Sequence, residues 1–150
     1  MKGMKILSTL VIAIAIFLAG YFTHKLTNET VQEVSSEVQF SYQSPEQPEQ
    51  IQVKQSYTNV EDQNVVDNIM MILMHKKPSS EVMDVDQPDM YINVLSPKQH
   101  TGLVDARVWF TESGAVIGDR VGESWDQVEF FEVNEQDADY LKEQGGFEEM

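Results

Sequence analysis

The chain has 150 residues, which suits one compact domain with appendages, and 41% of them are hydrophobic, enough for a core. Its net charge is −15, and all 25 acidic residues follow residue 25, which disfavours nucleic acid and anionic lipid headgroups as partners. There is no cysteine, which excludes disulfides, thiol catalysis, thiolate metal sites and lipidation on cysteine.

Residues 1–25 are predicted to anchor the chain in a membrane. Lys2 and Lys5 precede the apolar run "ILSTLVIAIAIFLAGYF", whose length is at the short end of the ~17–25 residues that a spanning helix needs. The run contains "LAG", as a lipoprotein signal does, but Tyr21 stands where the lipid-bearing cysteine would be. A cleavable signal is the alternative, although Leu18 fits a cleavage position poorly. We expect an uncleaved single-pass anchor in the cell membrane, with a cytoplasmic N-terminus and the rest of the chain outside.

Residues 26–50 are predicted to form a polar linker or stalk. They end in "SPEQPEQ", where two prolines among Gln and Glu favour an extended spacer. Apolar residues between 31 and 42 fit both a helical spacing and a strand-like alternation, so the period leaves both conformations open. An extracytoplasmic domain is then expected over residues 51–150.

The first half of that domain is predicted to be a strand followed by a helix. In residues 51–57 we expect Ile51, Val53 and Tyr57 on one side of a strand. An amphipathic helix follows in "NVEDQNVVDNIMMILMHKK", and Pro78 ends it. The acidic stretch "SSEVMDVDQPD" is predicted to be a loop.

The second half is predicted to be mostly strands. One strand is expected over 90–95, and a second over 104–111, where apolar and mostly polar residues alternate as in a half-covered antiparallel sheet. Gly114 suits the hairpin turn that leads to a short return strand. A last strand over 127–133 precedes a helix that Asn134 can cap and that ends at two glycines.

These elements indicate an α+β fold. We expect one amphipathic helix packed on an antiparallel sheet of about four to five strands. A short C-terminal helix is expected at the edge of the sheet. An N-terminal transmembrane helix is expected to precede the whole domain.

Four segments together resemble the YhfM-like small envelope domain of Bacillus relatives: "NVEDQNVVDNIMMIL", "QPDMYINV", "ARVWFTESGAVIGD" and "VEFFEVNEQDADYLKEQ". The resemblance covers about residues 50–144. Departures are Met90 between Asp89 and Tyr91, a different helix cap at Asn134, and the missing lipid cysteine. The resemblance implies a surface-tethered extracytoplasmic domain of unknown biochemical role, and it carries over no catalytic residue.

No pattern in the sequence predicts a catalytic, cofactor or metal site. The spacing of Asp84, Asp86 and Asp89 does not match a calcium-binding loop, because a proline occupies the fifth position and a leucine the twelfth. Trp109 and Trp125 are the candidates for an exposed recognition surface. For each, the alternative is a structural role under a loop or helix.

The sequence therefore predicts a non-enzymatic domain without cofactors, held at the membrane by its N-terminal helix. Its expected role is to bind a protein or a cell-envelope component. The alternative is an inhibitor or regulatory module of a membrane or secreted enzyme.

Overall fold

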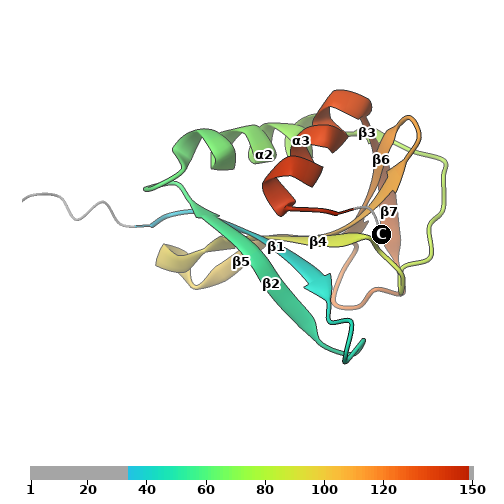
Figure 1. The fold of residues 1–150 in the computed structure, drawn as a ribbon, viewed down its shortest axis with the longest axis horizontal. Coiled ribbons are helices and arrows are strands. Elements are labelled where there is room, and N and C mark those ends of the chain that lie inside the picture. Colours follow the sequence, from blue (N-terminus) through green and yellow to red (C-terminus); the bar gives the residue numbers. More distant parts are fainter. Residues whose placement is uncertain (1–33, 149–150) are drawn as a thin grey trace, which may run out of the picture. The chain divides into compact units, whose positions relative to one another are not determined.

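Figure 1 shows an antiparallel sheet with two helices on one face; the computed structural model describes residues 34–148. The seven strands lie in the order β2-β1-β4-β5-β6-β7-β3. Their bounds are β1 (Glu37–Gln43), β2 (Ile51–Thr58), β3 (Lys77–Pro78), β4 (Met90–Ser96), β5 (Thr101–Thr111), β6 (Gly114–Arg120) and β7 (Val128–Asn134). The helices are α2 (Gln63–His75), α3 (Glu135–Gly145) and the short 3-10 turn η1 (Pro97–Gln99).

The predicted fold of one helix on four to five strands is wrong. The sheet has seven strands, and α3 lies on the same face as α2 instead of at the edge. Strand β1 falls within the segment 26–50 that was expected to be a linker, so the folded part begins before residue 51. Its inward side chains Val38 and Phe40 are fully buried, because β1 lies between β2 and β4.

The membrane anchor predicted over residues 1–25 lies outside the described residues. Within residues 34–148, neither helix has the length and apolar character that crossing a membrane requires.

The core lies between the helices and one face of the sheet. Helix α2 contributes Val66, Ile69, Ile72 and Leu73, at helical spacing, and α3 contributes Ala138 and Leu141. The strands supply alternate residues to the same cluster, among them Ile92, Val108 and Ile117. At the end of α2, Lys76 forms an ion pair of 2.6 Å with Asp119 of β6, which fixes the helix on the sheet.

A local signal at each end defines α3. The side chain of Asn134 accepts a hydrogen bond of 2.9 Å from the Asp137 N–H, as expected for a helix cap. At the other end Gly146 has a left-handed conformation with φ of 65°, which glycine adopts without strain.

The end of α3 is anchored by Tyr42 of β1. The Tyr42 hydroxyl donates a hydrogen bond of 3.0 Å to the Gly145 carbonyl and lies 3.2 Å from the Met90 sulfur. Burial of the phenol raises the pKa of Tyr42 to about 12.

This raised pKa predicts a loss of stability in alkali. The unfolded phenol ionises near pH 10, while the native one keeps its proton up to about 12. Its stabilising contribution is therefore complete below about pH 10 and is lost as the pH rises through 12. We expect urea midpoints to fall over this range, and to fall less steeply in Tyr42→Phe. Equal slopes in the two proteins would contradict the assignment.

Candidate binding groove

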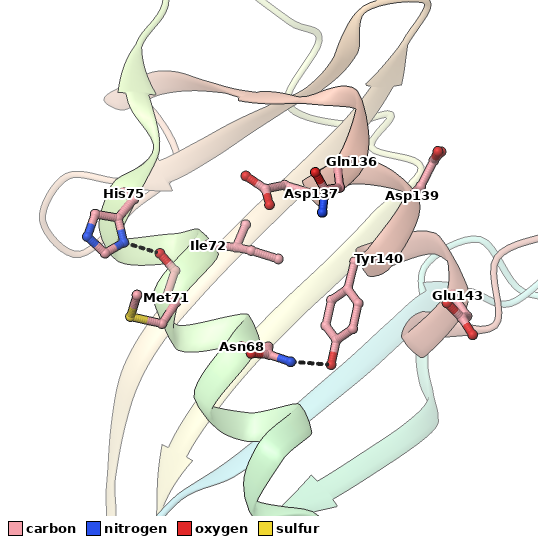
Figure 2. A pocket seen from close by; sticks show the side chains of 9 residues that line it. All are labelled: Asn68, Met71, Ile72, His75, Gln136, Asp137, Asp139, Tyr140 and Glu143. Atoms are coloured by element: carbon pink, nitrogen blue, oxygen red, sulfur yellow. Dashed lines mark hydrogen bonds between the residues drawn. The ribbon is translucent and has the colours of Figure 1, made fainter.

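A groove of about 570 Å³ lies between α2 and α3 on the helical side of the molecule (Figure 2). Helix α2 lines it with residues spaced three and four apart, which fall on one helix face. These are Asn68, Met71, Ile72 and His75. Helix α3 lines the other side with Gln136, Asp137, Asp139, Tyr140 and Glu143.

Hydrogen bonds hold several groove side chains in place. The Asn68 amide donates to the Tyr140 hydroxyl across the groove, at 3.3 Å. The ring Nδ1 of His75 donates to the Met71 carbonyl one turn earlier in α2, at 2.9 Å. Asp137 is held by the Asn134 amide, which donates to its carboxylate at 2.9 Å. The groove therefore has partly preformed walls.

The groove is negatively charged. Three carboxylates line it, those of Asp137, Asp139 and Glu143, and the lining includes no lysine or arginine. Met71 on α2, with 54% of its surface exposed, and the ring of Tyr140 on α3 add apolar surface to the lining. A cationic group on an aliphatic stem matches this combination, because its charge pairs with the carboxylates while its stem packs on the ring.

The structure buries Trp109, the first predicted recognition residue. Only 6% of its surface is exposed, and its indole N–H donates to the carbonyls of Asp84 and Gln87. Its ring packs against Phe130 and over Gly118, where a Cβ would lie 3.0 Å from the indole. The structural alternative is thus the correct one for Trp109, which binds the loop 79–89 to the sheet face opposite the helices.

Trp125 lies on the same face of the sheet and is half-buried. Its ring stacks on the Arg107 guanidinium, whose centre is 3.9 Å from the ring centroid. Arg107 also donates to the Val85 carbonyl, so this one side chain contacts both Trp125 and the loop 79–89. The two tryptophans stabilise the part of this face that the loop 79–89 covers, and neither lines the groove.

Two acidic side chains of the loop 79–89, those of Asp84 and Asp89, also accept hydrogen bonds within the fold. Asp84 accepts a hydrogen bond from the Asp86 N–H at 3.0 Å, and Asp89 accepts one from the Phe110 N–H at 2.7 Å. Within residues 34–148 no three His, Asp or Glu side chains come together as metal ligands.

The groove residues were missed by sequence reasoning. Asn68, Met71 and His75 do share one face of the predicted helix, but only the packing of α3 beside that face makes it a wall. Comparisons of the chain with protein-family models, with curated proteins and with solved structures gave no match.

Proposed function

We propose that this chain is a non-enzymatic, extracytoplasmic domain, tethered to the cell membrane by its N-terminal helix, that binds a protein or a cell-envelope component. The groove between α2 and α3 carries the proposal. It offers three carboxylates beside the ring of Tyr140, which is suited to a lysine or arginine side chain of the partner.

Hydrogen bonds give the groove a fixed surface for a ligand. His75, Tyr140 and Asp137 each take part in a hydrogen bond that stabilises α2, α3 or the contact between them. Side chains with such structural roles present a fixed surface to a ligand. Preformed surfaces bind with a smaller loss of conformational entropy than mobile ones.

Photo-crosslinking in intact cells tests this function. A photoreactive residue at Met71, which lines the groove and is exposed, should give one main crosslinked partner. Neutralising two exposed acids of the groove, in Asp139→Asn with Glu143→Gln, should remove most of that product. The matched control Glu112→Gln with Glu129→Gln changes the net charge equally at exposed positions outside the groove and should leave the product intact.

The same cells test the location of the domain. Protease added to intact cells before irradiation should cleave the domain and abolish the crosslink. A crosslink that survives protease would contradict the extracytoplasmic location. Equal crosslinking in the two double variants would contradict binding in the groove.

A further inference from the structure

Strand β2 has an open edge. It forms one outer edge of the sheet and pairs with β1 on one side, while within the described part of the chain no strand covers its other side (Figure 1). Residues 51–56 are exposed, including Ile51 at 53% and Val53 at 54%. With eight residues, β2 is long for an unprotected edge.

The hydrogen bonds at the two ends of the strand pair show which backbone groups face outward. The Ser44 N–H donates to the Gln50 carbonyl, and the Asn59 N–H donates to the Ser36 carbonyl. From these points along β2, residues whose backbone groups bond to β1 alternate with residues whose backbone groups face outward. The bulge opposite Phe40 shifts this alternation by one residue. The N–H groups of Ile51, Val53 and Ser56 therefore point away from β1 and towards solvent.

Apart from the bulge at Lys54, β2 has little of the protection usual for an edge strand. The opposite edge, β3, has two residues and includes Pro78, which cannot donate to a further strand. Strand β2 has no proline and no acidic residue, and its one charged side chain is Lys54. Lys54 donates to the Gly146 carbonyl and lies over the Tyr42 ring, so it is turned towards α3.

Acidic residues flank the open edge at both ends. Glu46 and Glu49 precede β2, and Glu61 and Asp62 follow it. A second copy of this chain paired antiparallel would bring the first pair close to the second, and like charges would repel. A strand with basic residues at its ends would be attracted instead.

We infer that β2 accepts an extended segment of the partner protein as an added strand, with basic residues flanking a core of about eight residues. Backbone hydrogen bonds to the outward groups of β2 would supply affinity. Ile51 and Val53, both on the sheet face opposite the helices, would contact apolar side chains of the segment. This inference rests on the proposed function, since it identifies a second contact for a cationic protein partner.

The test uses the full chain in detergent micelles and two fluorescent peptides. Both peptides have the same alternating Thr-Val core of eight residues; one has two lysines at each end and the other two glutamates. By fluorescence anisotropy at low salt, the lysine-flanked peptide should bind at least about tenfold more tightly. Val53→Pro, which removes an outward N–H, should weaken binding about tenfold, whereas Val53→Thr, which keeps it, should change binding less than about threefold.

Amide hydrogen exchange gives a second readout that needs no variant. The lysine-flanked peptide should slow exchange at Val53 and Ser56. Ile51→Pro, at the first position of the strand, is a second blocking variant in case Val53→Pro unfolds.

The inference would be overturned by equal losses of peptide affinity in Val53→Pro and Val53→Thr, by unchanged exchange at Val53 and Ser56, or by a wild-type dimer that Val53→Pro dissociates. The last outcome would indicate that the open edge of β2 pairs with a second copy of this chain. If blocking β2 has no effect while Asp139→Asn with Glu143→Gln abolishes the cellular crosslink, the inference fails and the proposed function stands.

Discussion

Replacing Trp109 with alanine is expected to lower the free energy of unfolding by about 3–5 kcal/mol. The indole is buried between the sheet and the loop 79–89, contacts Phe130 with a centroid separation of 5.8 Å, and donates to two loop carbonyls. Alanine would leave a cavity and two carbonyls without this donor. Urea denaturation of the full chain in micelles, followed by circular dichroism, measures the change.

Two further variants separate the contributions to this loss. Trp109→Phe keeps most of the apolar contact and removes the N–H donor, so it should cost about 1–3 kcal/mol. Leu103→Ala, at a side chain with 49% of its surface exposed, should stay within about 0.5 kcal/mol of the parent. If Trp109→Ala lowered the free energy of unfolding no more than Leu103→Ala does, the indole would not be holding the loop on the sheet.

The second large effect is expected for Gly114→Ala, which should destabilise the domain by about 3 kcal/mol. Gly114 has a φ of 146°, a conformation that other residues rarely adopt. A Cβ at this position would lie 2.1 Å from the Val133 carbonyl oxygen and 2.9 Å from the Asn134 carbonyl carbon. The β6–β7 pairing must shift to relieve both contacts.

Gly102→Ala is the matched control for this prediction. Gly102 lies in β5 of the same sheet, and a Cβ there would meet no atom within 4 Å. Its free energy of unfolding should stay within about 0.5 kcal/mol of the parent. Similar urea midpoints for the two glycine variants would show that the hairpin adapts to a side chain.

The groove and the open edge of β2 favour the same class of partner. One offers carboxylates to a cationic side chain, and the other offers backbone groups between acidic flanks. The net charge of −15 strengthens both preferences and opposes self-association through either surface. Variants at Asp139 and Val53 separate the two contributions.

The sequence by itself determined the features that depend on neighbouring residues. The Asn134 cap and the two glycines define α3, because capping involves backbone groups within one helical turn. The alternation from Val104 to Phe110 predicted the main part of β5, since strand side chains point to opposite faces in turn. The hairpin at Gly114 followed from its tolerance of positive φ.

Tertiary structure alone decided the features that depend on distant partners. The periodicity around β1 fitted helix and strand equally, and pairing with β2 and β4 selected the strand. The bulge at Lys54 places Tyr57 on the helical side of the sheet and Val53 on the other, which contradicts their predicted common face. Trp109 is covered because a loop over 20 residues away in sequence crosses its face, and the groove exists because α3 packs beside α2. Such contacts form between segments far apart in the chain, so no local pattern encodes them.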